Sequence, residues 1–139
     1  MGLRKVWVGD WYQPKSPART IIFNGLCSMG GSLPSALACA LVDGDCPIVV
    51  LTGDGGFLMN SQELDTATRL GLAFTIVVFV DWQLSLIKQH QIDAHLTVTG
   101  VRFTNPDFAL YAQSFGVTHR RARSTQDFNR SLGRRPVEP

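Results

Sequence analysis

An aspartate within a run of glycines is the feature of this sequence with the clearest chemical meaning. The run reads Gly53-Asp54-Gly55-Gly56, and a second aspartate, Asp81, follows a later apolar segment. Glycines at a turn allow positive φ and let backbone N–H groups approach a phosphate closely. A carboxylate beside a phosphate is repulsive unless a cation lies between them, and Mg²⁺ binds one or two carboxylates together with phosphate oxygens. The pattern therefore predicts a site for a metal ion and a diphosphate.

Two common phosphate-binding loops are excluded by the residues around this turn. The dinucleotide fingerprint G-x-G-x-x-G needs a glycine where Leu58 stands, and the pattern G-x-x-x-x-G-K followed by Ser or Thr occurs nowhere in the chain. An ordinary tight turn between a strand and a helix remains an alternative for the glycines alone, since Gly and Asp are frequent in such turns. For Asp81 the alternative is that it starts a turn or caps the next element.

Two short apolar segments are expected to place these aspartates close together. Residues 46–52 and 73–80 are nearly continuous apolar runs, which is the pattern of strands buried on both faces of a parallel sheet. Asp54 and Asp81 follow the carboxyl ends of these runs. Ligand sites in open parallel sheets gather outside the carboxyl ends of neighbouring strands. We therefore expect both carboxylates to reach one ion.

The rest of the chain alternates between strand and helix patterns. Further strands are predicted at residues 20–24 and 117–121. Helices are predicted at residues 33–42, 84–89 and 124–132. Another helix is expected to begin at a capping box formed by Asn60 and Glu63, and a further one to run from an N-cap at Asn105 to about Gly116. Alternation of this kind predicts an α/β fold with an open parallel sheet and helices on both faces.

One domain is expected, because 139 residues suffice for a single compact core. Residues 1–19 are expected to form an irregular N-terminal segment, residues 20–132 the α/β domain, and residues 133–139 a basic tail. His90 and His95 are expected in a loop after the second aspartate, either lining a substrate pocket or simply exposed.

Three motifs, in the same order along the chain, resemble those of the thiamine-diphosphate enzymes and especially of their acetolactate synthase-like members. The first is N-G-L-C-S-M-G-G-S-L-P-S-A at residues 24–36. The second is Gly53-Asp54-Gly55 followed by E-L-D-T-A-T-R-L at residues 63–70 and by a hydrophobic strand that ends at a metal ligand. The third comprises L-I-K at residues 86–88, N-P-D-F at 105–108 and F-G at 115–116. The resemblance covers residues 20–132.

The resemblance implies a role for each matched residue of the metal-diphosphate site. Asp54 and Asp81 match the side-chain ligands of Mg²⁺, and Gln83 matches the position whose backbone carbonyl completes the protein's share of the metal shell. Gly55 and Gly56 match the backbone donors to the diphosphate. Many relatives have Asn where this chain has Asp81, but a carboxylate is an equally competent oxygen ligand.

The upstream motif implies contacts to the aminopyrimidine ring of the cofactor. Met29 matches the apolar side chain that keeps the cofactor bent, and the backbone carbonyl of Cys27 would accept a hydrogen bond from the 4′-amino group. The position of Cys27 is frequently glycine in relatives. The full set of expected cofactor-binding residues is Cys27, Ser28, Met29, Gly53, Asp54, Gly55, Gly56 and Asp81.

The resemblance also implies an activity and partners. The cofactors would be thiamine diphosphate and Mg²⁺, and the reaction would decarboxylate a 2-oxo acid such as pyruvate and ligate the product to a second carbonyl compound. The partner would be a pyrimidine-type domain of the same family in another subunit of a homo-oligomer. The glutamate that activates the cofactor belongs to that domain, so no catalytic residue is identified here.

Several alternatives to this activity remain open. The chain is expected to be a truncated diphosphate domain that is inactive without a pyrimidine domain. It could instead belong to a decarboxylase or lyase of the same superfamily, or be a noncatalytic fragment that only binds cofactor or a partner subunit.

The composition of the chain indicates its order, its possible partners and its compartment. The chain is 45% hydrophobic and 17% charged, which indicates an ordered domain. A net charge of +2, with basic residues concentrated only near the C-terminus and no aromatic platform, does not favour nucleic acid. Three cysteines without a C-x-x-C pair favour free thiols in a reducing compartment. No signal or membrane-spanning pattern is evident, so we expect a cytoplasmic location and no membrane partner.

Overall fold

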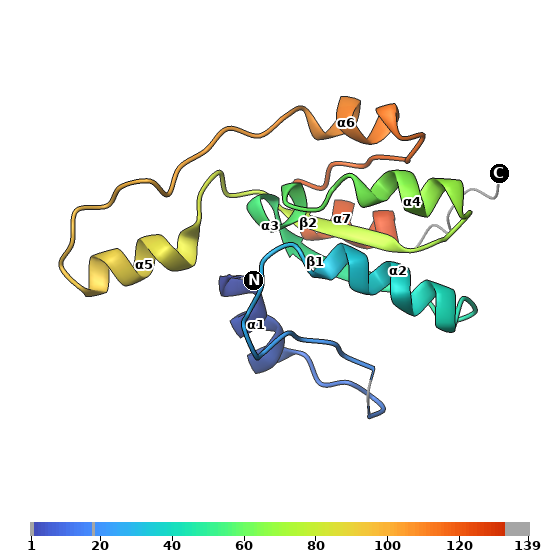
Figure 1. The fold of residues 1–139 in the computed structure, drawn as a ribbon, viewed down its shortest axis with the longest axis horizontal. Coiled ribbons are helices and arrows are strands. Elements are labelled where there is room, and N and C mark those ends of the chain that lie inside the picture. The colour runs from blue at the N-terminus through green and yellow to red at the C-terminus, as the bar shows by residue number, and fades with distance from the viewer. Residues whose placement is uncertain (1, 18, 133–139) are drawn as a thin grey trace.

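A pair of parallel strands lies at the centre of the computed structural model, which describes residues 2–17 and 19–132 (Figure 1). Strand β1 pairs with β2 in a register that runs from Val49 opposite Thr75 to Gly53 opposite Phe79. The elements in chain order are α1 (Leu3–Trp11), α2 (Ser32–Val42), β1 (Val49–Gly53), α3 (Asp54–Leu58), α4 (Glu63–Arg69), β2 (Thr75–Phe79), α5 (Ser85–Asp93), α6 (Phe108–Ser114) and α7 (Thr125–Leu132).

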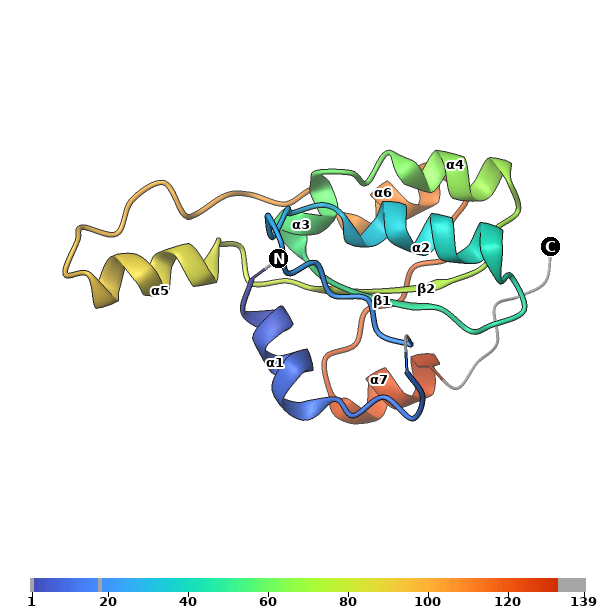
Figure 2. The ribbon, with the colours of Figure 1, turned by 60° about the horizontal axis from the view of Figure 1, so that its bottom comes forward.

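Helices lie on both sides of this sheet. Figure 2 shows α2, α4 and α6 on one side and α1 and α7 on the other. The α/β fold with a parallel sheet, predicted from the sequence, is therefore confirmed. Burial on both faces is not confirmed for β1, because Val50 and Thr52 are buried whereas Val49 and Leu51 are exposed.

The core lies on the α2, α4 and α6 side of the sheet. Its buried centre is formed by Leu33, Phe57 and Leu64. The ring of Phe57 makes edge contacts with the rings of Phe108 and Tyr111, at centroid distances of 5.9 and 6.3 Å. These contacts fix α6 over α3, so the segment that leads into α6 is anchored beside the strand ends.

Helix α5 projects away from the sheet, and the chain returns from it as a long extended segment (Figures 1 and 2). No residue of α5 is buried, because the helix has no packing partner among the described elements. This projecting arm comprises residues 83–104, and its two ends are joined by an antiparallel bridge between Gln83 and Arg102. The arm therefore begins and ends at the carboxyl edge of the sheet.

Two of the predicted strands are not formed. Residues 20–24 and 117–121 have no strand structure, and within the described part of the chain the sheet contains only β1 and β2. Ile21 is exposed and has no neighbouring strand to pair with. After α6 the chain turns at Gly116, whose φ is +71°, and the Val117 N–H donates to the Ala112 carbonyl at the helix end.

Residues 3–11 form α1, so the prediction of an irregular segment over residues 1–19 is wrong in this part. The predicted helices at 33–42, 84–89 and 124–132 are formed with shifted ends. His90 lies within α5 rather than in a loop, whereas His95 does lie in the loop after it. The predicted basic tail at 133–139 lies outside the described residues.

Neither of the two predicted helix caps is formed. The capping box of Asn60 and Glu63 is not formed, because the Asn60 side chain donates to the Gly30 carbonyl at 3.1 Å. Asn105 is not the N-cap of α6. That position is taken by Asp107, whose carboxylate accepts from the N–H groups of the second and third helical residues.

Candidate functional site

The carboxylate of Asp54 is the most deeply buried charged group of the described chain, at 1% exposure. It directly follows β1. Its Oδ1 accepts the Gly55 N–H at 2.9 Å. Its Oδ2 accepts three donors, namely the Trp82 N–H at 2.9 Å, the Asp81 N–H at 3.2 Å and the Asn105 side-chain amide at 2.7 Å. These hydrogen bonds offset the cost of burying a carboxylate.

Asp81 follows the carboxyl end of β2, and its backbone lies against the Asp54 carboxylate. The hydroxyl of Ser85 donates to Asp81 Oδ2 at 2.5 Å, which holds this carboxylate at the start of α5. The structure therefore brings Asp54 and Asp81 together at one edge of the sheet. Whether both bind an ion stays a prediction.

The glycines of the turn are required by close packing rather than by positive φ. Among the glycines that the structure describes, φ is positive at Gly30, Gly71, Gly100 and Gly116, and not in the turn. A Cβ on Gly55 would lie 3.1 Å from the Phe103 ring and 3.3 Å from Leu84, and one on Gly56 would lie 3.2 Å from the Thr52 hydroxyl. The Gly55 N–H already donates to Asp54, so a diphosphate would share that donor with the carboxylate.

The backbone carbonyl of Gln83 is left available by the bridge that joins the ends of the arm. Gln83 and Arg102 are opposite each other, but the hydrogen bonds of the bridge are made by the residues beside them. These bonds run from Leu84 N to Val101 O at 2.8 Å and from Phe103 N to Trp82 O at 3.3 Å. The predicted carbonyl ligand is therefore not consumed by this pairing.

The segment expected to meet the aminopyrimidine is an irregular loop that leads into α2 beside α3 (Figure 1). Cys27 has φ of +51°, the region that favours glycine, and its side chain is exposed. Ser28 is exposed and Met29 is half-buried. The hydrogen bond from Asn60 to Gly30 ties this loop to the turn after α3, so the two predicted halves of the cofactor site lie on neighbouring segments.

Asn105 is the residue of this site that the sequence did not reveal. It lies 51 residues beyond Asp54, yet its side-chain amide makes the shortest hydrogen bond to that carboxylate. The N-P-D-F motif includes this position, but its Asn-Pro pair predicts a helix cap and no contact with Asp54. Spacing alone could not reveal the contact, because it depends on the return path of the arm.

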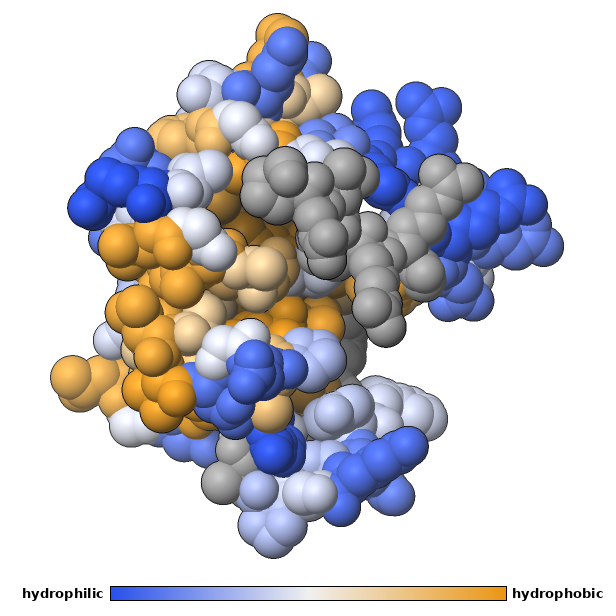
Figure 3. All heavy atoms as spheres, turned by 90° about the vertical axis from the view of Figure 1, so that its right-hand side faces the viewer, coloured by the Kyte–Doolittle hydropathy of each residue, from blue (hydrophilic) through white to orange (hydrophobic). Residues whose placement is uncertain are grey.

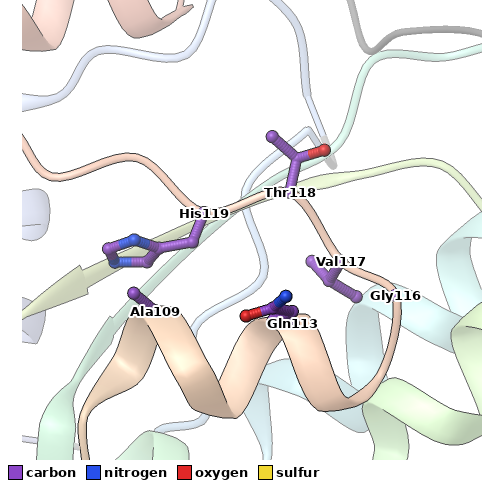
Figure 4. A pocket seen from close by; sticks show the side chains of 6 residues that line it. All are labelled: Ala109, Gln113, Gly116, Val117, Thr118 and His119. Atoms are coloured by element: carbon purple, nitrogen blue, oxygen red, sulfur yellow. The ribbon is translucent and has the colours of Figure 1, made fainter.

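A separate hollow of about 410 Å³ lies between α6 and the chain that follows it (Figure 4). It is lined by Ala109, Gln113, Gly116, Val117, Thr118 and His119. None of the predicted site residues belongs to this set, so the hollow is distinct from the aspartate edge.

The donor set at the aspartate edge suits a hard divalent cation. Among the residues that the structure describes, no three His, Cys, Asp or Glu side chains gather to hold a metal. Two carboxylates and one carbonyl nevertheless fit Mg²⁺, which usually keeps water and phosphate oxygens in its shell. Asp54 Oδ1 has one hydrogen-bond donor whereas Oδ2 has three, so Oδ1 retains capacity for an ion.

No helix in the described ranges is long and apolar enough to cross a membrane.

Comparison with known proteins identifies the family of this chain. Residues 1–135 match the family described as "Thiamine pyrophosphate enzyme, C-terminal TPP binding domain". The chain is 32% identical over 124 residues to an acetolactate synthase of Bacillus subtilis, covering 89% of this chain and 22% of the relative. It is 31% identical over 134 residues to a probable acetolactate synthase large subunit of Methanococcus aeolicus, covering 95% and 22%. A catabolic acetolactate synthase of Raoultella terrigena is 33% identical over 116 residues, covering 84% and 21%. The chain thus spans about a fifth of the length of these relatives.

Proposed function

Because this chain belongs to the thiamine pyrophosphate enzymes, as the C-terminal cofactor-binding domain of acetolactate synthase-like members, we propose that it binds thiamine diphosphate through Mg²⁺. The observation that carries the proposal is the meeting of Asp54 and Asp81 at the carboxyl ends of two parallel strands. A buried carboxylate held by four hydrogen bonds is fixed in orientation before any ligand arrives.

The residues expected to hold the cofactor fall into two groups. The carboxylates of Asp54 and Asp81 and the carbonyl of Gln83 would hold the ion, and the glycine turn of residues 53–56 would lie against the diphosphate. The loop of residues 27–29 would contact the aminopyrimidine. The support for this division is the hydrogen bond from Asn60 to Gly30, which keeps the loop beside α3.

We propose that the complete enzyme decarboxylates a 2-oxo acid such as pyruvate and ligates the product to a second carbonyl compound. Bound thiamine diphosphate supplies the carbon nucleophile and the electron sink for this chemistry. The chain's own residues bind and orient: Asp54 and Asp81 neutralise the metal, and the packed turn brings backbone close to the diphosphate. A decarboxylase or lyase of the same superfamily uses the same cofactor-binding residues and remains the alternative reaction.

We propose a pyrimidine-type domain, in another subunit of a homo-oligomer, as the partner that completes the site. The exposed side chains next to the half-buried Met29 support this, since Leu26 is 97% exposed and Phe23 is also exposed. Without such a partner the chain would bind cofactor but not turn over substrate. Cys39 and Cys46 are free thiols, which supports a reducing compartment such as the cytoplasm.

The metal-dependent binding of the cofactor tests this proposal. Titration calorimetry of the purified chain with thiamine diphosphate should show binding with Mg²⁺ and none after its removal by a chelator. The Asp81→Ala variant should lose binding, because it removes one of two carboxylates, while its circular dichroism melt stays cooperative. Asp65→Ala removes an exposed carboxylate of α4 and should bind as the parent chain does. Binding that persists in the chelator or in Asp81→Ala would overturn the proposal.

A further inference from the structure

The side chain of Asn105 contacts Asp54 from a segment that no metal ligand occupies. Its Nδ2 lies 2.7 Å from Asp54 Oδ2, which is shorter than the three backbone contacts to the same carboxylate. Hydrogen bonds to a carboxylate are among the strong ones in proteins. Because Oδ2 also accepts two backbone N–H groups, Asn105 fixes the rotation of the carboxylate and leaves Oδ1 as the freer oxygen.

The backbone of Asn105 is itself held on its C-terminal side. Pro106 follows and disfavours the helical region for the residue before it. Asp107 then caps α6, and α6 is anchored to the core through the rings of Phe108 and Tyr111 on Phe57. Asn105 is thus a short side chain on a fixed backbone, which is what a positioning role requires.

The other end of the Asn105 amide is not satisfied by the protein. Its Oδ1 is buried and has no hydrogen-bond donor among the described residues. The orientation of the amide follows from the contact with Asp54, because an oxygen turned toward the carboxylate would be repelled. A buried acceptor without a donor is costly and rare in native proteins, and it is retained where a ligand or water completes it.

We propose that Asn105 is a positioning residue of the cation site. Its Nδ2 orients the Asp54 carboxylate toward the ion, and its Oδ1 accepts a hydrogen bond from a water that Mg²⁺ keeps in its shell. The inference rests on the proposed function, since it assigns a residue to the same metal site. Hydrogen-bond partners of metal ligands typically change metal affinity by about 10–100-fold when removed.

The test measures how much Mg²⁺ is needed for thiamine diphosphate to bind. In calorimetric titrations at fixed cofactor, the half-saturating Mg²⁺ concentration should rise at least about tenfold in Asn105→Ala. The Asn105→Leu variant keeps the side-chain volume without either polar atom and should show the same rise if the alanine variant fails to fold. Tyr111→Phe is the matched control, because it removes the 2.7 Å hydrogen bond between Tyr111 of α6 and Ser61 without touching Asp54.

A spectroscopic measurement separates positioning from loss of stability. With Mn²⁺ in place of Mg²⁺, the electron paramagnetic resonance spectrum of the cofactor complex should change in Asn105→Ala and Asn105→Leu, and stay as in the parent chain for Tyr111→Phe. If the parent chain does not bind the cofactor with Mg²⁺, the proposed function fails and this inference with it. If the parent binds and the Asn105 variants match it in Mg²⁺ requirement and spectrum, or if Tyr111→Phe shifts both equally, the inference alone is overturned.

Discussion

At the scale of single residues, the site is organised around one carboxylate oxygen. Asp54 Oδ2 accepts from Trp82, where the projecting arm leaves the sheet, and from Asn105, where the chain has returned. One oxygen therefore joins both ends of the arm to the end of β1. A metal ion bound at Oδ1 would sit on a carboxylate whose position depends on both of these segments.

Gly30 offers a residue-scale prediction about the loop beside this site. Its φ is +84°, and an added Cβ would lie 2.6 Å from Asn60 Nδ2 and 3.0 Å from Met59 Cβ. Gly30→Ala should therefore lower the free energy of unfolding by the left-handed backbone penalty of about 1–2 kcal/mol and by a further amount of about 1–3 kcal/mol for overpacking. Urea denaturation followed by circular dichroism measures the change.

Gly100→Ala provides the control for this prediction. Gly100 also has positive φ, at +67°, but an added Cβ would meet no atom within 4 Å. Only the backbone penalty should then appear. Equal losses in the two variants would show that the packing of Gly30 against Asn60 does not contribute.

The two aspartates could be predicted from the sequence, whereas their supporting residues could not. Asp54 and Asp81 each follow an apolar run, so local patterns place them at strand ends. The contacts of Asn105 with Asp54 and of Asn60 with Gly30 join residues 51 and 30 positions apart. Such contacts depend on how loops return, which no local pattern encodes.

At the scale of elements, helix α6 connects the core to the site. Its aromatic side chains pack on Phe57 of α3, and its first residue follows directly on the segment that holds Asn105. Helices with a regular apolar pattern, such as α2, were predicted nearly to the residue. The strand at residues 20–24 was predicted wrongly because a strand needs a neighbour for its hydrogen bonds, and propensity does not supply one.

The cap of α6 gives an element-scale prediction. Asp107 accepts the N–H groups of Ala109 at 2.8 Å and Leu110 at 3.3 Å. Asp107→Ala should destabilise the chain by about 1 kcal/mol, because two N–H groups at the helix start lose their acceptor. Asp107→Asn keeps a capping oxygen and should stay close to the parent chain. Thermal melts of both variants check this, and a loss in Asp107→Asn as large as in Asp107→Ala would show that charge rather than the cap matters.

At the scale of the whole molecule, a sheet with two strands in the described part of the chain leaves much apolar surface uncovered. Figure 3 views the end of the molecule at which α2 and α4 terminate, and apolar atoms gather over part of it. Val42, in the last turn of α2, is 88% exposed, and Leu41 and Leu70 are also exposed. The projecting arm adds Ile87, Ile92 and Leu96. Extended apolar surface of this kind marks regions that associate with other surfaces.

We therefore expect the isolated chain to self-associate at micromolar concentration and to be stabilised by a pyrimidine-type domain of its family. Self-association should follow because water is removed from apolar side chains at α2, at the arm and around Leu26, which is 97% exposed. Within residues 2–17 and 19–132 the sheet contains only β1 and β2, so its outer edges offer sites for further strand pairing.

Sedimentation velocity across a concentration series measures the association, and a melt with and without the pyrimidine-type domain measures the stabilisation. A partner that binds only the folded chain raises its stability in proportion to the logarithm of partner concentration over Kd, so the melting temperature should climb with added partner. Leu26→Ser should reduce that climb, because Leu26 lies in the loop proposed to meet the partner, whereas Val42→Ser, at the far end of α2, should leave it unchanged. Two results together would contradict the assignment of these surfaces to association: a single monomeric species at all concentrations, and a melting temperature that does not change when the partner is added.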